Sequence, residues 1–192
     1  MIEALVNAEK FLLLFIQDVI RGPILTPFNI VVTKLGDGGM IWIGIAVILL
    51  FPKKTRKIGC MVILSLMGSL LINNLFLKNL VARTRPYDII GNLIPLIEKP
   101  TDYAFPSEHT ASSFAAAGIL YRKLPRRFGI PAVILAALIG LSRLYLGVHY
   151  PSDVLCGAIS GIGISYAAEI AVNQLSIYFG GKNDNKEADI LR

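Results

Sequence analysis

The chain has 192 residues, of which 54% are hydrophobic and 17% charged, with a formal net charge of +6. A hydrophobic fraction this high excludes an ordinary soluble domain and favours a protein whose solvent is the lipid bilayer. The positive charge does not indicate a nucleic-acid partner, because its excess gathers in two short links between apolar segments, where anionic lipid headgroups are the natural partner.

The first apolar segment, Phe11 to Ile20, has two interpretations. Charged residues recur around it, among them Glu3, Lys10 and Asp18. A tilted membrane crossing and an amphipathic helix lying at the interface both fit this pattern. The sequence Gly36-Asp37-Gly38-Gly39 then predicts a turn.

Five longer apolar segments follow. Ile58 to Leu77 carries no charge and is long enough, as a helix, to span a hydrocarbon core of about 30 Å. The others are residues 38–51, 110–121, 128–148 and 154–179. We therefore expect an all-α, polytopic membrane bundle of six helices, forming a single domain over residues 1–192 with a polar tail at 181–192. Gly157 and Gly161 have the spacing of small residues that let helices pack closely.

Basic residues orient the bundle in the membrane. The link after the second segment and the link after the fourth each hold Lys and Arg without an acid: Lys53, Lys54, Arg56 and Lys57 in one, Arg122, Lys123, Arg126 and Arg127 in the other. Short links of this kind remain in the cytoplasm. The links that hold residues 78–109 and 149–153 are then expected together on the extracytoplasmic face of the cell membrane.

The first of three polar blocks contains Lys78 and the pair Arg85-Pro86. On a helix that continues to Thr84, positions seven apart lie on nearly the same face. Pro86 forces Arg85 out of helical geometry, which frees its guanidinium to contact two phosphate oxygens. The alternative is that these cations only anchor a helix end among the headgroups.

The chain's two histidines stand in the other two blocks. Pro106 is expected as the first residue of a helix, with Ser107, Glu108 and His109 in its first turn, where free N–H groups and the helix dipole attract anions. His149 precedes a second such start, and Asp153 lies four positions after it. A carboxylate at this spacing can orient one ring nitrogen and leave the other free to attack phosphorus.

Arg143 and the two cysteines lie inside apolar segments. A cation there is costly unless it has a partner, and a bound phosphate would supply one to Arg143. Cys60 and Cys156 are expected to be packed thiols. Because the chain has no cluster of Cys and His, we expect no metal site and no cofactor.

In order and spacing, the three blocks resemble the signature of the type-2 phosphatidic acid phosphatase superfamily, or lipid phosphate phosphatases, which share their active site with vanadium haloperoxidases. The family pattern is Lys-x6-Arg-Pro, Pro-Ser-Gly-His and Ser-Arg-x5-His-x3-Asp. This chain has Lys78 with Arg85-Pro86, Pro106-Ser107-Glu108-His109, and Ser142-Arg143 with His149 and Asp153. The motif core covers residues 78–153.

The resemblance implies a metal-independent lipid phosphatase with a phosphohistidine intermediate. His149 would attack phosphorus, Asp153 would orient it, and His109 would protonate the leaving oxygen. The phosphoryl oxygens would be held by Lys78, Arg85, Ser107, Glu108 through its backbone N–H, and Arg143.

Glu108 stands where the family usually has glycine, so its carboxylate must face away from phosphate or be neutralised by a neighbour such as Arg83 or Lys99. Phosphatases of the bacitracin-resistance type, which act on undecaprenyl diphosphate, resemble this chain in having an acid there. A polyprenyl diphosphate is thus favoured, and phosphatidic acid and phosphatidylglycerol phosphate stay open. The competing function is a non-catalytic lipid carrier or scramblase that retains the fold. The sequence does not indicate the oligomeric state.

Overall fold

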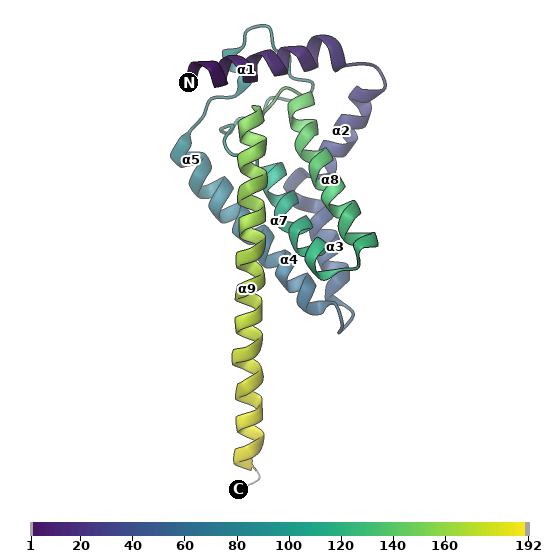
Figure 1. Cartoon of the computed structure of the whole chain (residues 1–192), viewed down its shortest axis with the longest axis vertical. Helices are drawn as coiled ribbons and strands as arrows, with labels where there is room; N and C mark the ends of the chain where they lie inside the picture. The colour runs from purple at the N-terminus through teal and green to yellow at the C-terminus, as the bar shows by residue number, and fades with distance from the viewer. Residues whose placement is uncertain (1, 191–192) are drawn as a thin grey trace.

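The protein is a bundle of helices with one helix laid across its end (Figure 1). The computed structural model describes residues 2–190, and every regular element in that range is a helix, as the sequence predicts. The side chains of the expected polar tail, 181–192, lie outside the described residues. In chain order the elements are α1 (Ile2–Phe15), η1 (Ile16–Ile20), α2 (Leu25–Leu35), η2 (Asp37–Gly39), α3 (Met40–Leu50), α4 (Arg56–Ser69), η3 (Leu70–Leu77), α5 (Lys78–Val81), α6 (Pro86–Ile89), α7 (Glu108–Lys123), α8 (Arg126–Tyr145) and α9 (Pro151–Ile190).

Three segments of the described chain are long and apolar enough to cross a membrane: Arg56–Ile89, Arg126–Tyr145 and Pro151–Tyr178. A fourth crossing results if α2 and the following η2–α3 segment, bent by 47° at their break, form one span. The expected six crossings are therefore not confirmed. α7 has 16 residues and α1 has 14, and both are shorter than the roughly 20 residues that a helix needs to cross the hydrocarbon core. Because α1 lies across the bundle end (Figure 1), the interfacial alternative describes it better than a tilted crossing.

α7 is the central helix, packed against α4, α8 and α9. Its buried residues are mostly small, which allows the neighbouring backbones to come close. A side chain at Gly161 would place its Cβ 2.2 Å from the carbonyl oxygen of Ala111, and one at Gly157 would meet that of Ser107 at 2.7 Å. The predicted close packing through these glycines is confirmed.

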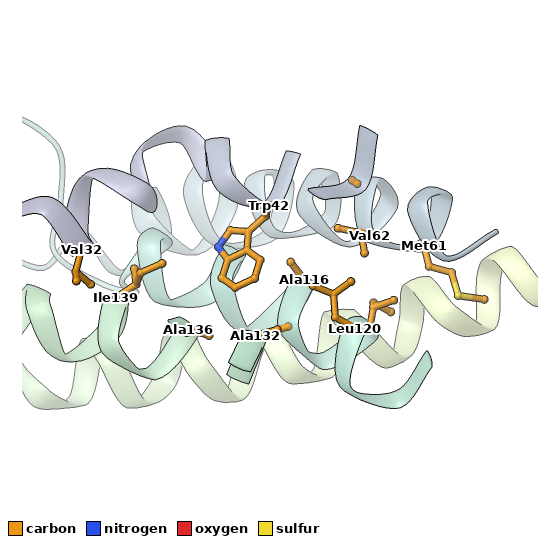
Figure 2. Close-up of a cluster of buried hydrophobic side chains, with 12 residues drawn as sticks. Val32, Trp42, Met61, Val62, Ala116, Leu120, Ala132, Ala136 and Ile139 are labelled. Atoms are coloured by element: carbon orange, nitrogen blue, oxygen red, sulfur yellow. The ribbon is translucent and has the colours of Figure 1, made fainter. Parts of the chain in front are cut away.

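The hydrophobic core lies between α7, α8 and the hairpin of α3 and α4 (Figure 2). Trp42 is fully buried at its centre, and its indole N–H donates to the Ser113 hydroxyl at 3.0 Å. Large apolar side chains remain exposed on outer faces, for example Phe76 and Ile159, as expected of a bundle in lipid. Cys60 is also exposed there, so the expectation of a packed thiol is wrong for it.

Two helix ends differ from the sequence prediction. α5 stops at Val81 because Ala82 adopts a left-handed conformation (φ 48°, ψ 41°), so the helix does not continue to Thr84. Arg85 is extended (φ −73°, ψ 152°), as its position before proline requires. α7 begins at Glu108 with Ser107 as its N-cap residue, so Pro106 precedes the helix instead of opening it.

The links at the two ends of the bundle differ in character. The basic links, α3–α4 and α7–α8, lie at one end (Figure 1). The α6–α7 loop and the short α8–α9 loop lie at the other end, where α1 crosses the bundle; part of the α6–α7 loop rises above α1, and the α8–α9 loop lies below it (Figure 1). All three polar blocks therefore meet at the end away from the basic links, and α9 begins at Pro151 as predicted.

Candidate active site

A cavity of about 540 Å³ lies between the junction of η3 with α5 and the start of α7. One part of its wall is polar and the other apolar. The polar residues include Lys78, Arg85, Asp102, Glu108, His109, Arg143 and His149, and the apolar ones include Ile43, Ile63, Leu66, Met67 and Leu70. Of the residues predicted for the site, Ser107 and Asp153 are absent from this lining.

Lys78 and Arg85 are both buried, and both meet the carboxylate of Asp102 in the α6–α7 loop. Nη2 of Arg85 lies 2.5 Å from Oδ1, Nε donates to the Asp102 carbonyl at 2.8 Å, and Lys78 binds Oδ2. Partial burial disfavours the charged carboxylate, but the hydrogen bonds and charges of Lys78 and Arg85 outweigh this and lower the pKa of Asp102 to about 2. An anion thus already engages the two cations predicted to bind phosphate.

His149 is 2% exposed and lies in the loop before α9. Its Nε2 is 3.3 Å from Nη1 of Arg85. Because a guanidinium only donates hydrogen bonds, Nε2 must carry the lone pair, which places the proton of the neutral ring on Nδ1. Burial, followed by the charges of Arg143 and Arg85, holds the pKa of His149 well below its usual value. The result is a neutral imidazole with its nucleophilic nitrogen at the cationic part of the cavity.

Asp153 is fully buried behind His149. Its Oδ2 lies 3.5 Å from Nδ1 of His149 and accepts the backbone N–H of Tyr150 at 2.8 Å. Nδ1 makes no hydrogen bond among the described residues. The separation is longer than a hydrogen bond but short enough for the carboxylate to attract the Nδ1 proton, and such contacts tighten when substrate binds.

Arg143 is a buried cation without a carboxylate partner among the described residues. Its Nη1 donates to the Thr33 hydroxyl at 2.6 Å, and its Nε makes no hydrogen bond to a residue that the structure describes. A buried guanidinium with donors to spare has the chemistry expected of an anion ligand.

His109, in the first turn of α7, contacts Asp37, an acid in the Gly36–Gly39 turn that was not predicted as a site residue. Its Nε2 lies 2.8 Å from Oδ1 of Asp37 in η2. An ionised carboxylate only accepts, so this contact places a proton on Nε2. His109 is partly exposed, whereas His149 is enclosed.

Ser107 and Glu108 were predicted to bind phosphoryl oxygens, but in the structure their side chains bind other residues of the protein. The Ser107 hydroxyl is fully buried and accepts from Thr110 at 2.9 Å, so its contact with phosphate stays a prediction. Glu108 lines the cavity and accepts from the Ser69 hydroxyl at 3.1 Å. The expectation that Arg83 or Lys99 neutralises Glu108 is wrong here, because Arg83 binds Glu9 and Asp153 and Lys99 lies over the Tyr87 ring.

The acids Asp37 and Asp102 and the hydroxyl of Thr33 were not among the predicted site residues. Asp37 stands between glycines in a turn, and Asp102 is one of several acids in a long polar link. Neither context distinguishes them from solvated surface acids, and only the tertiary fold brings them to the cavity.

The cavity places cations and imidazoles, which have the chemistry to bind and transfer a phosphoryl group, beside an apolar wall that suits hydrocarbon. In such a site, cations can stabilise the charge that develops on phosphoryl oxygens, one imidazole can act as a nucleophile, and the other can give a proton. In the described part of the chain, no group of three or more His, Cys, Asp or Glu is arranged to hold a metal ion.

The chain is similar to known proteins of one superfamily. The model of the PAP2 superfamily matches residues 58–176. An undecaprenyl-diphosphatase of Sulfolobus acidocaldarius is 35% identical over 66% of this chain and 61% of its own length. A bacitracin transport permease protein of Bacillus licheniformis is 31% identical over 77% of this chain and 72% of its own length.

Among solved structures, the transmembrane PAP2-type phosphatidylglycerolphosphate phosphatase of Bacillus subtilis superposes with a TM-score of 0.73 at 27% identity. The superposition covers 89% of this chain and 87% of that one. The polar blocks and most of the bundle that carries them fall inside these matches.

Proposed function

The chain belongs to the PAP2 superfamily, and from this premise we propose that it is a metal-independent membrane phosphatase that removes phosphate from a lipid. One observation carries the proposal: a single cavity joins three cations and two imidazoles to an apolar wall between α3, α4 and η3. A phosphorylated headgroup fits the polar part, and its hydrocarbon chain fits the wall.

In the proposed reaction, the lone pair on Nε2 of His149 forms a bond to phosphorus as the bond from phosphorus to the leaving oxygen breaks. His109 gives a proton to that oxygen, and the lipid product departs. Water, deprotonated by His109, then attacks the phosphohistidine and releases inorganic phosphate. Asp153 stabilises the positive charge that the His149 ring acquires in the first step.

Three cations hold the phosphoryl oxygens in this scheme. Nε of Arg143 has no hydrogen-bond partner among the described residues, whereas Lys78 and Arg85 must exchange the carboxylate of Asp102 for phosphate. The predicted contributions of Ser107 and of the Glu108 backbone N–H belong to the same step.

The preferred substrate class is a polyprenyl diphosphate. Support comes from the 35% identity to a protein named undecaprenyl-diphosphatase and from Glu108, the acid by which this chain resembles phosphatases of the bacitracin-resistance type. A diphosphate offers a second phosphate as leaving group, which a general acid such as His109 can protonate. Phosphatidic acid and phosphatidylglycerol phosphate are the alternatives to be measured beside it.

The decisive experiment is phosphate release by the full chain, purified in detergent, with EDTA present. The panel contains undecaprenyl diphosphate, phosphatidic acid and phosphatidylglycerol phosphate at equal surface concentration. We expect release without added metal and fastest with the diphosphate. If none of the lipids releases phosphate, yet the protein moves labelled lipid between the leaflets of a vesicle, it is the carrier or scramblase instead.

The site is proposed to face the extracytoplasmic side of the cell membrane, because the basic links lie at the opposite end of the bundle (Figure 1). Lys54→Cys and Asn92→Cys, each in a chain without Cys60 and Cys156, report on the two ends. In intact cells, a membrane-impermeant thiol reagent should label the cysteine at 92 and spare that at 54. The reverse pattern would put the reaction in the cytoplasm.

A further inference from the structure

Glu9 is a buried acid on a helix that is otherwise largely exposed. It is 3% exposed, whereas Leu5 and Phe11 on the same helix are 56% and 71% exposed. Its Oε2 binds Nη2 of Arg83 at 2.7 Å, and its Oε1 accepts the backbone N–H of Ser152 at 2.9 Å and the Ser152 hydroxyl. Burying a carboxylate is costly unless it is paired, and this one is paired on both oxygens.

Arg83 connects Glu9 to the acid behind His149. Its Nη1 donates to Oδ1 of Asp153 at 2.6 Å, and its guanidinium lies 3.9 Å from the centre of the Tyr150 ring. Neither Glu9 nor Arg83 lines the large cavity. Glu9 therefore has no place in the lining of that cavity, and its connection to His149 runs through Arg83 and Asp153.

Asp153 is held on both of its oxygens. Oδ1 is fixed by Arg83, while Oδ2 binds the N–H of Tyr150 and faces Nδ1 of His149. The orientation of Oδ2 toward the imidazole thus depends on where Arg83 holds Oδ1. Glu9 in turn sets the position of Arg83 and, through Ser152, ties α1 to the first turn of α9.

We infer that Glu9 of α1 is a positioning residue for the nucleophile, acting on His149 through Arg83 and Asp153. The inference rests on the proposed function. Glu9 and Asp153 each carry a negative charge and Arg83 carries a positive one, so these three side chains together have one net negative charge. That charge stabilises the ring of His149 as it becomes positive on bonding to phosphorus. Without the Glu9 charge, Arg83 neutralises Asp153 and the stabilisation is lost.

Glu9→Gln keeps the size of the side chain and removes the charge, and Glu3→Gln on the exposed part of α1 is the matched control. With lipid substrate we expect kcat to fall roughly 10- to 100-fold with KM nearly unchanged, the scale known for loss of a group that orients a metal-bound imidazole. In an Asp153→Asn background, Glu9→Gln should have little further effect, because the two residues act in series. Glu9→Asp, which restores the charge, should recover part of the loss.

A readout independent of turnover separates this inference from the proposed function. The chain has only two histidines, so the ring nitrogens of His149 can be observed by NMR in ¹⁵N-histidine protein, with His109→Gln for assignment. Glu9→Gln should change the His149 tautomer signals and leave those of His109 in place, whether or not any lipid is hydrolysed.

The inference is overturned if the His149 signals and kcat of Glu9→Gln match those of wild type, even if the melting temperature falls. Glu9 would then only fasten α1 to the bundle. If the NMR change occurs and wild type hydrolyses no lipid, the positioning role stands and the proposed function fails.

Discussion

The two helix starts that deliver the histidines are built differently. At the start of α9, His149 and Asp153 are almost completely enclosed, and Arg83, itself paired with Glu9, binds the carboxylate of Asp153 and fixes it. At the start of α7, the side chain of His109 is 21% exposed and that of its partner Asp37 is 51% exposed. Both are imidazole–carboxylate pairs, yet only one is shielded from water.

The difference matches the two tasks in the proposed reaction. A nucleophile must keep one tautomer and one orientation, which burial and a fixed acid provide. A general acid must exchange protons with water in every cycle, which requires access to solvent. The enclosed pair should therefore be sensitive to any loss of geometry, and the open pair mainly to changes in charge and pH.

Replacement of His149 tests the enclosed pair most severely. His149→Ala removes the proposed nucleophile, so phosphate release should fall roughly 1,000-fold or more. Acid-labile, base-stable label from a phosphorylated substrate should appear on the wild-type protein and not on the variant. Label of this kind on His149→Ala would assign the nucleophile to another residue.

Arg143→Lys should give the next largest effect. The charge remains, but an ammonium cannot reproduce the fork of a guanidinium. A loss of about 2 kcal/mol in transition-state binding, seen as a lower kcat/KM, is the scale for hydrogen bonds to charged groups. Arg126→Lys in the basic link at the other end serves as the control. If both variants keep wild-type activity, Arg143 serves only to anchor its helix.

The sequence predicted the bundle and the main residues of the cavity, but not the features that depend on tertiary contacts. The all-α membrane bundle followed from uncharged apolar runs such as 58–77, and the cavity residues Lys78, Arg85, His109, Arg143 and His149 from three spaced blocks. The left-handed Ala82 could not be predicted, because a non-glycine residue in this conformation depends on tertiary contacts.

The partners of the site residues were also beyond the sequence analysis. Glu9 and Asp37 reach the histidine pairs from elements more than seventy positions away in the chain. Each lies beside apolar segments where a surface acid is equally expected. Pairing over such distances is set by how helices pack, which no local pattern encodes.

Asp37→Asn tests the open pair. Burial and the charge of Arg143 lower the pKa of His109 to about 4, and the hydrogen bond and charge of Asp37 oppose this lowering. Removal of the carboxylate should therefore lower that pKa further, shift the alkaline limb of the rate profile to lower pH and reduce the rate at neutral pH by roughly tenfold. Glu108→Gln is the matched variant in the same cavity, and because Glu108 binds Ser69, its shift should be in the same direction and smaller. A larger shift for Glu108→Gln would show that Glu108, not Asp37, tunes His109.

Asp102 gives the smallest predicted effect, and one of opposite sign. Its carboxylate engages Lys78 and Arg85, so it competes with phosphate for the cations beside His149. Asp102→Asn removes the competing charge while the backbone carbonyl still accepts from Nε of Arg85. Because the Asp102 side chain is half-exposed, solvent screens the pairs, and inhibition by inorganic phosphate should strengthen by only roughly threefold.

The lowered pKa means that Asp102 stays charged from neutral pH down to about 2, so in wild type this competition persists throughout the acid range. Asp88→Asn, in α6 and outside the cavity, should leave phosphate inhibition unchanged. Weaker inhibition in Asp102→Asn would mean that the carboxylate positions the two cations for phosphate instead of competing with it.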